Sequence, residues 1–89
     1  MLYIVRWTGK PEHRNAAIER FKRTGGAPPA GVKMLGRWHE IGSTAGCAIA
    51  ESSDPVAVQK WALDWSDLLD MDVRAALNDE QLGQALASI

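Results

Sequence analysis

This chain of 89 residues has little of the residue types on which several protein classes depend. Its single cysteine, Cys47, excludes an intramolecular disulfide and suits a reducing compartment. It also lacks the Cys-x-x-Cys pair with which small metallochaperones bind their metal. Its two histidines, His13 and His39, are too few and too scattered to form a metal site with that cysteine. We therefore predict no metal and no cofactor.

Long apolar runs and an excess of one charge are also missing. No stretch approaches 18 consecutive apolar residues, so no transmembrane helix is expected. The apolar N-terminal run is too short for a secretory signal peptide and follows no basic region. The 10 basic and 11 acidic side chains nearly balance, which argues against the clustered cations of nucleic-acid binding. We expect a soluble, cytoplasmic protein without nucleic-acid or membrane partners.

The apolar content is sufficient for a folded protein. Hydrophobic residues make up 46% of the chain, which is ordinary for globular proteins and too high for disorder. The length predicts a single domain over residues 1–89 with a modest core.

Short apolar and alternating segments predict four strands. They cover residues 2–8, 31–40, 46–51 and 68–77. The second strand is expected to place Val32, Met34, Gly36 and Trp38 on one face, and Lys33, Leu35, Arg37 and His39 on the other.

Capping residues predict three helices between and after these strands. The first begins at Pro11 and stops at Gly25. The second follows Asp54, an N-cap residue, with Pro55 at its first position. The third follows the sequence Asn-Asp-Glu-Gln from Asn78, which is typical of a capping box.

The order β-α-β-β-α-β-α predicts an α+β, ferredoxin-like βαββαβ fold with an extra C-terminal helix. The four-stranded antiparallel sheet then has the order 4-1-3-2. The first and third strands are apolar at nearly every residue, as central strands should be. The second and fourth carry charges at alternate residues, as edge strands often do.

This fold leaves one face of the sheet uncovered, because the two crossover helices pack on the other. Uncovered apolar faces usually mark an interface. We therefore predict a homodimer through the open sheet face. The alternative is that the last helix covers part of this face or embraces a partner.

Two tryptophans, Trp61 and Trp65, lie four residues apart and share one face of the second helix. We expect them to be core residues or the wall of a pocket, with Trp65 buried. Asp67 follows this helix, where its carboxylate can accept hydrogen bonds from free backbone donors. On that basis Asp67→Asn should be milder than Asp67→Ala.

Three segments resemble a family of small bacterial proteins known only as a domain of unknown function. They are Gly46-Cys-Ala-Ile-Ala-Glu-Ser-Ser-Asp54-Pro55, Trp61-x-x-x-Trp65-Ser-Asp67-Leu and Asn78-Asp79-Glu80. The resemblance places the chain with the dimeric α/β-barrel superfamily, in which two ferredoxin-like sheets pair into a barrel. It implies that any ligand cleft lies between sheet and helices. Branches of that superfamily include cofactor-independent oxygenases and isomerases as well as haem-binding proteins, so the fold does not select a function.

The candidate chemical groups are sparse. His39, beside Arg37 at the end of an edge strand, is the natural acid or base near neutral pH. Alternation gives it only cations, Arg37 and Lys33, on its own face, and a working base usually has a carboxylate to orient it. Cys47 is expected to be buried and inert. The third strand has no aromatic residue, which excludes the stacking surface of an RNA-recognition domain.

Two functional hypotheses remain. The first is a non-catalytic binding or assembly module that holds a small apolar ligand or a partner. The second is a cofactor-independent enzyme of the oxygenase or isomerase type, with a cleft between sheet and helices. We predict no catalytic residue, and a ligand site formed by five residues: Arg37, Trp38, His39, Trp61 and Trp65. An aspartate converging with Arg37 and His39 in a closed cavity would favour the enzyme.

Overall fold

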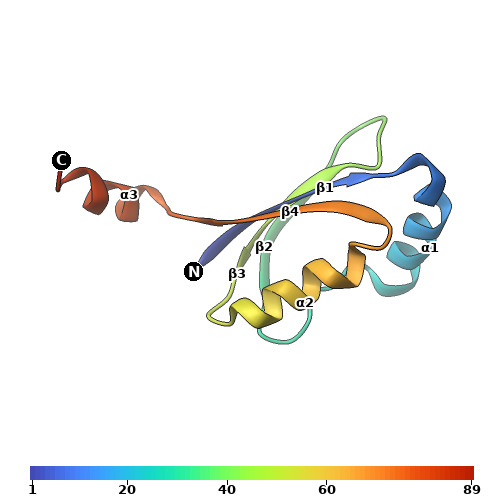
Figure 1. Ribbon diagram of the computed structural model, residues 1–89, viewed down its shortest axis with the longest axis horizontal. Helices are drawn as coiled ribbons and strands as arrows, with labels where there is room; N and C mark the ends of the chain where they lie inside the picture. Colours follow the sequence, from blue (N-terminus) through green and yellow to red (C-terminus); the bar gives the residue numbers. More distant parts are fainter.

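The computed structural model describes residues 1–89 and has the predicted order of elements (Figure 1). The strands are β1 (Leu2–Gly9), β2 (Lys33–His39), β3 (Gly46–Glu51) and β4 (Leu69–Ala76). The helices are the short 3₁₀ helix η1 (Pro11–His13), α1 (Arg14–Thr24), α2 (Pro55–Trp65) and α3 (Asp79–Leu86). Every strand end lies within two residues of its predicted position. None of the helices combines the length and apolar character needed to cross a membrane.

The four strands form one antiparallel sheet in the order β2-β3-β1-β4. This is the predicted 4-1-3-2 order, and the α+β, ferredoxin-like fold is confirmed. β1 and β3 are central, and the charged strands β2 and β4 are the edges.

The helix boundaries follow the predicted capping residues. The Asp54 carboxylate accepts a hydrogen bond of 3.0 Å from the Val56 N–H at the start of α2. At α3, the Asn78 side chain accepts the Gln81 N–H at 2.8 Å, while the Gln81 side chain accepts the Asn78 N–H at 3.0 Å. Gly25 ends α1 with a φ of 69°, a left-handed conformation that favours glycine.

The main core lies between α2 and one face of the sheet. It consists of Tyr3, Val5, Ala48, Ala50, Val58 and Trp61. The two alanines of β3 are completely buried, and their small side chains let the large Trp61 ring pack against the sheet. The core is small, as the chain length predicts.

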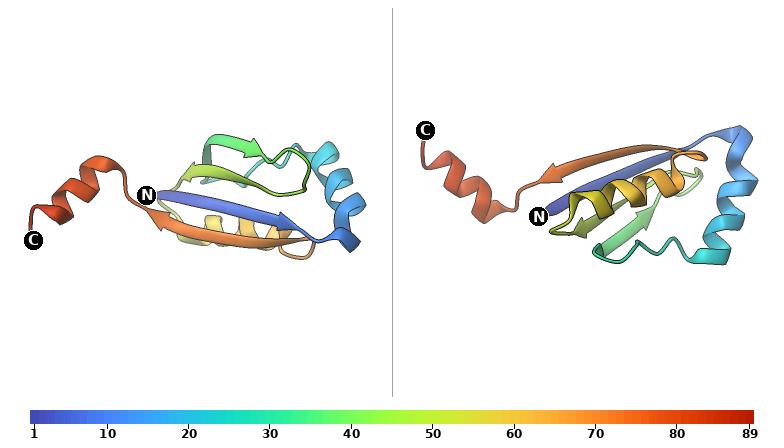
Figure 2. Two further views of the ribbon diagram at one scale, coloured as in Figure 1. Left: turned by 90° about the horizontal axis from the view of Figure 1, so that it is seen from above. Right: turned by 60° about the horizontal axis from the view of Figure 1, so that its bottom comes forward.

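The first helix is placed differently from the prediction that both crossover helices cover the sheet. α2 runs along the sheet, whereas α1 stands across one end of it (Figure 2). A second, smaller cluster attaches α1 there, formed by Ala17 of α1 with Leu68 and Leu69 at the start of β4. Because α1 is held only at this end, a hollow remains between α1 and the sheet.

A β-bulge in β2 overturns the predicted alternation of that strand. The pairing with β3 shifts between Met34, which faces Ala50, and Gly36, which faces Ile49. The bulge adds one residue to β2 and so exchanges the faces of the residues that follow it. Arg37 and His39 consequently lie on the helix-covered face with Met34, while Gly36 and Trp38 lie on the open face.

The bulge also corrects the predicted surroundings of His39. Lys33 precedes the bulge and pairs with Glu51, on the open face of the sheet. Of the two cations expected beside His39, only Arg37 shares its face.

The other face of the sheet is not covered by this chain, as predicted. Leu2, Ile4 and Ile49 lie on it in the central strands, together with Trp38 on the edge. The Trp38 ring lies over Gly36, where a Cβ atom would come within 2.5 Å of the indole. An apolar strip therefore crosses this face.

The C-terminal helix does not cover that strip. α3 projects beyond the end of the sheet and away from the body of the molecule (Figures 1 and 2). The radius of gyration is accordingly 14.6 Å, against about 12 Å for a compact chain of this length. The apolar residues of this segment, Leu82, Leu86 and Ile89, are exposed to 47%, 55% and 99%.

Candidate functional site

The hollow beside α1 is an open cleft of about 950 Å³. It lies between α1, the helix-covered face of the sheet, the end of α2 and the loop that joins β2 to β3. Its aromatic lining consists of Trp7, Phe21, Trp61 and Trp65. Its volume falls within the range of sites that bind small molecules, roughly 300–1,000 Å³. We call this hollow the α1 cleft.

Arg37 reaches the α1 cleft because the β2 bulge turns it to this face. Its Nη1 donates a hydrogen bond of 3.1 Å to the Gly26 carbonyl oxygen, and its guanidinium lies 4.9 Å from the centre of the Phe21 ring. Gly26 is buried with a φ of 61°, and a Cβ atom there would come within 2.8 Å of Arg37 Nη1. A glycine at position 26 therefore gives Arg37 its place against the end of α1.

His39 lies beside Arg37 in the same cleft. Its ring meets two aromatic rings edge-on, with centroids 5.8 Å from Trp7 and 5.5 Å from Phe21. Neither ring nitrogen makes a hydrogen bond, and no Asp or Glu lines the cleft. Arg37 and His39 thus converge as the sequence suggested, but in an open cleft and without an aspartate.

The two tryptophans of α2 have different surroundings. Trp61 is 5% exposed and belongs to the main core, with one part lining the α1 cleft. Trp65 is only half-buried, and the Arg20 guanidinium lies 5.4 Å from its ring centre. The prediction that Trp65 is buried is wrong, because α1 stands at the end of the sheet and leaves one side of this ring facing the cleft.

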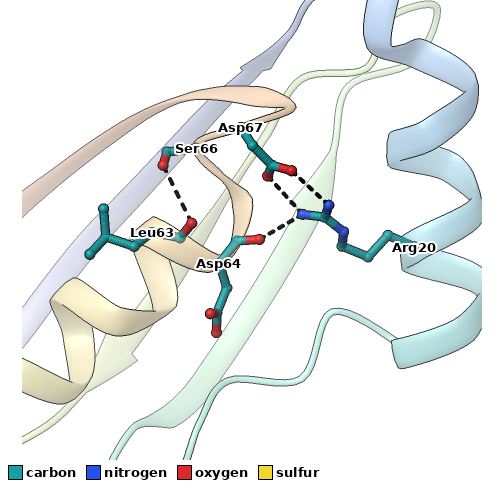
Figure 3. A network of polar contacts seen from close by, with 5 residues as sticks. All are labelled: Arg20, Leu63, Asp64, Ser66 and Asp67. Carbon is teal, nitrogen blue, oxygen red and sulfur yellow. Dashed lines mark hydrogen bonds and ion pairs between the residues drawn. The ribbon is translucent and has the colours of Figure 1, made fainter.

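An ion pair ties α1 to the end of α2 (Figure 3). Both terminal nitrogens of Arg20 donate to the Asp67 carboxylate at 2.8 Å, and Nη1 also donates to the Asp64 carbonyl oxygen at 2.7 Å. This hydrogen-bonded guanidinium lowers the pKa of Asp67, and the carboxylate raises the pKa of Arg20. This ion pair is the polar part of the contact that attaches α1 to the rest of the chain.

The predicted local role of Asp67 is therefore corrected. Its main partner is a charged side chain 47 residues earlier in the sequence, while hydrogen bonds from its own backbone and that of Leu68 are lesser causes of its lowered pKa. The residue that follows the helix directly, Ser66, bonds the Leu63 carbonyl oxygen instead, at 3.4 Å (Figure 3).

One of the five predicted site residues lies elsewhere. Trp38 is on the open face, 59% exposed, because the bulge reverses its direction. The prediction that Trp38 shares one site with the other four residues is wrong. Arg37, His39, Trp61 and Trp65 all line the α1 cleft. Cys47, expected to be buried, is half-buried and pairs with Trp38 on the open face.

The sequence analysis missed Trp7 and Phe21 as lining residues. Trp7 shares a strand face with Tyr3 and Val5 by simple alternation, which places it on the helix-covered side. Phe21 ends the apolar face of α1. Both signals were present, but they predict core packing until α1 is known to stand off the sheet.

The structure brings together no group of three or more His, Cys, Asp and Glu side chains in an arrangement suited to a metal ion. The cleft instead offers aromatic surface, the hydroxyl-bearing residues Ser43 and Thr44, and the cations Arg14, Lys22 and Arg37. Such a lining favours contact with an apolar body and leaves a few polar groups to orient it.

Comparison with known proteins gives a family and a fold. A family described as "Domain of unknown function (DUF3303)" matches residues 1–89. No curated protein matches the chain. Among the solved structures that match is "Structure of Rv0793 from Mycobacterium tuberculosis", with 13% sequence identity and a TM-score of 0.50, covering 88% of this chain and 95% of that chain. At this identity the likeness shows the fold alone. The barrel dimer and the tryptophan signature remain predictions.

Proposed function

This chain belongs to the family of the domain of unknown function DUF3303, and we propose that it is a non-catalytic module that holds a small apolar ligand in the α1 cleft. The observation that carries the proposal is the cleft itself: about 950 Å³ lined by four aromatic rings, with no segment of the chain filling it. Apolar surface removed from water contributes roughly 25 cal/mol per Å². Aromatic walls of this kind therefore favour an apolar occupant.

Two contacts attach α1 beside the cleft. The Ala17, Leu68 and Leu69 cluster holds one side, and the Arg20–Asp67 pair holds another. Both attachments join the middle of α1 to residues 67–69, and the Arg37–Gly26 hydrogen bond joins the segment after α1 to β2. A cleft wall held in this way is preorganised, which reduces the entropy that a ligand must overcome on binding.

A thermal-shift screen of small apolar compounds tests this function. A ligand at a concentration of 100 Kd stabilises the folded state by about 2.7 kcal/mol, which raises the melting temperature by roughly 10–20 °C in a domain of this size. Ile18 is half-buried on α1 and lines the cleft, so Ile18→Trp should obstruct it and abolish the shift.

Leu63→Trp provides the matched control, because Leu63 is 59% exposed on α2 and lies outside the cleft lining. It should leave the ligand-induced shift intact. The proposed function would be contradicted if Ile18→Trp and Leu63→Trp changed the ligand-induced shift in melting temperature equally. It would also be contradicted if no compound of a broad apolar library bound.

We also propose that two copies of this chain pair through the open sheet face. The apolar strip of Ile4, Ile49 and Trp38 supports this assembly, because a sheet face of this kind is usually covered in the native state. The rim supports it too, since it carries both signs of charge: Arg74 and Asp72 lie on the same face of β4. A twofold interface brings each patch against its own copy, and a rim of mixed sign is suited to that symmetry.

The projecting α3 supports the same assembly. An isolated helix of eight residues is marginal in water, and its Leu82 and Leu86 side chains have no partner within the chain. We propose that α3 embraces the second copy, which gives these leucines a surface to cover.

Light scattering at micromolar concentration tests the dimer. We expect twice the chain mass of 9.7 kDa. Ile49→Thr keeps a β-branched residue in the strand while removing apolar surface, and it should raise the dimer dissociation constant; Leu82→Ser should do so as well. Val56→Thr, at a 61% exposed position on α2, is the control. A strictly monomeric wild type would end this proposal.

The enzyme hypothesis is the alternative, and it depends on His39. The residue lies in the cleft, yet it has no carboxylate to fix its tautomer, so binding is favoured over catalysis. Any ligand from the screen should therefore be recovered unchanged after incubation with the protein. Turnover by the wild type that His39→Gln abolishes, with fold and binding retained, would replace the binding module by an enzyme.

A further inference from the structure

The charges around the α1 cleft are of one sign, although the chain as a whole is nearly neutral. Three of its 10 basic residues line the cleft, namely Arg14, Lys22 and Arg37, and none of its 11 acidic residues does. This separation is not a property of the whole surface, because the net charge is −1.

None of the three cations of the cleft has a carboxylate partner. The ion pairs of this chain join Lys10 to Asp70, Arg20 to Asp67 and Arg74 to Asp72, all outside the cleft lining. Arg37 makes one hydrogen bond, to a backbone carbonyl, and is half-buried against Phe21. A guanidinium has five N–H donors, so most of those on Arg37 have no acceptor in the protein.

Resting on the proposed function, we infer that the ligand of the α1 cleft is a small apolar anion: an aromatic or aliphatic body that carries one carboxylate, bound by Arg37. The aromatic lining receives the body, and the unpaired guanidinium receives the charge. Most of the N–H donors of Arg37 have no acceptor in the protein, so they are available to an anionic ligand. The planar guanidinium matches a carboxylate in geometry as well as in charge.

The position of Arg37 fits this role better than the positions of the other two cations. Arg14 and Lys22 are exposed on α1, where water competes for their charge, and Arg14 already donates to Asn15. Arg37 projects from β2 and contacts the Gly26 carbonyl oxygen and the Phe21 ring. We expect Arg14 and Lys22 to attract the anion and Arg37 to hold it.

Three probes with one ring system and different charge test the inference: 2-naphthoate, 2-naphthalenemethanol and 2-naphthylmethylammonium. Their dissociation constants are measured with the full chain by isothermal titration calorimetry. We expect 2-naphthoate to bind about tenfold more tightly than the alcohol, the size of a net charge-assisted hydrogen bond, and the ammonium to bind more weakly than the alcohol.

Arg37→Gln should abolish the preference for the carboxylate while leaving the affinity for the alcohol within about twofold, because the aromatic walls remain. Arg37→Lys keeps the charge but lacks the planar pair of N–H donors of a guanidinium, so it should retain part of the preference for the carboxylate. Arg74→Gln changes the net charge equally on the open face, and it should retain the full preference. Circular dichroism establishes that each variant is folded.

Equal affinity of the wild type for the carboxylate and the alcohol would overturn the anion inference and leave the proposed function standing. An equal loss of preference in Arg37→Gln and Arg74→Gln would also overturn it, since the effect would then come from net charge. If Arg37→Gln does not fold, Arg37→Lys replaces it in the test. A full preference of Arg37→Lys for the carboxylate over the alcohol would then overturn the anion inference. Absence of binding by all three probes would contradict both proposals.

Discussion

Replacing each tryptophan of α2 with alanine should have clearly different effects on stability. Trp61 is 5% exposed and packs against Tyr3, Val5 and the two buried alanines of β3, so its removal leaves a cavity in the main core. Buried Trp→Ala substitutions cost about 3–5 kcal/mol. A domain of this length has a total stability of roughly 4–13 kcal/mol, so Trp61→Ala removes a large part of it.

Trp65→Ala should cost about half as much, ~2 kcal/mol, because one side of the ring already faces the cleft. Part of this loss comes from the Arg20 guanidinium, which then has no ring to lie against. Urea unfolding followed by far-ultraviolet circular dichroism gives both free energies, provided that the m value is unchanged.

Trp61→Phe is the companion variant if Trp61→Ala fails to fold. It keeps most of the apolar volume, and it should lose stability without unfolding. An equal loss in Trp61→Ala and Trp65→Ala, or a loss below about 1 kcal/mol in Trp61→Ala, would refute the division of roles between core and cleft wall.

Asp67→Asn and Gly46→Ala probe the site and its attachment, and Gly83→Ala is the control for the second. The pKa of Asp67 is lowered in the folded state, so its ion pair stabilises the fold above the ordinary carboxyl pKa, and this contribution is lost as the pH falls through the folded-state value. Asp67→Asn should therefore be less stable than the wild type in urea unfolding at pH 6, and the difference should shrink at pH 3; a difference independent of pH would contradict the ion-pair account. Gly46→Ala should cost about 1–3 kcal/mol and displace Trp7, because its Cβ would lie 2.5 Å from the Trp38 carbonyl oxygen and 2.6 Å from the Trp7 ring. Gly83→Ala, in an open helical position, should instead stabilise α3 slightly, and a destabilisation of equal size in both variants would refute the steric argument.

The fold was largely predictable from the sequence because its signals are local. Asp54 with Pro55 and Asn78 with Gln81 mark helix starts through hydrogen bonds within three residues. The apolar β1 and β3 and the charged β2 and β4 distinguish central strands from edge strands without any knowledge of tertiary contacts.

The site was less predictable because it depends on two non-local features. The β2 bulge is defined only by pairing with β3, and it determines that Arg37 and His39 face the cleft while Trp38 does not. The position of α1 across the end of the sheet depends on contacts between distant parts of the sequence, namely the Ala17, Leu68 and Leu69 cluster and the Arg20–Asp67 pair, which joins residues 47 apart (Figure 3). Trp65 and Phe21 are cleft residues for this second reason, although their helical spacing predicts a filled core.

The chemical shifts of the four tryptophan indoles test the central claim most directly, because the protein carries its own internal control. Trp7, Trp61 and Trp65 line the α1 cleft, whereas Trp38 lies on the opposite face of the sheet. In a ¹H–¹⁵N correlation spectrum titrated with 2-naphthoate, we predict saturable shifts of the first three indole signals and none of the fourth. Shifts confined to Trp38, or no saturable shift at any of the four, would contradict the account.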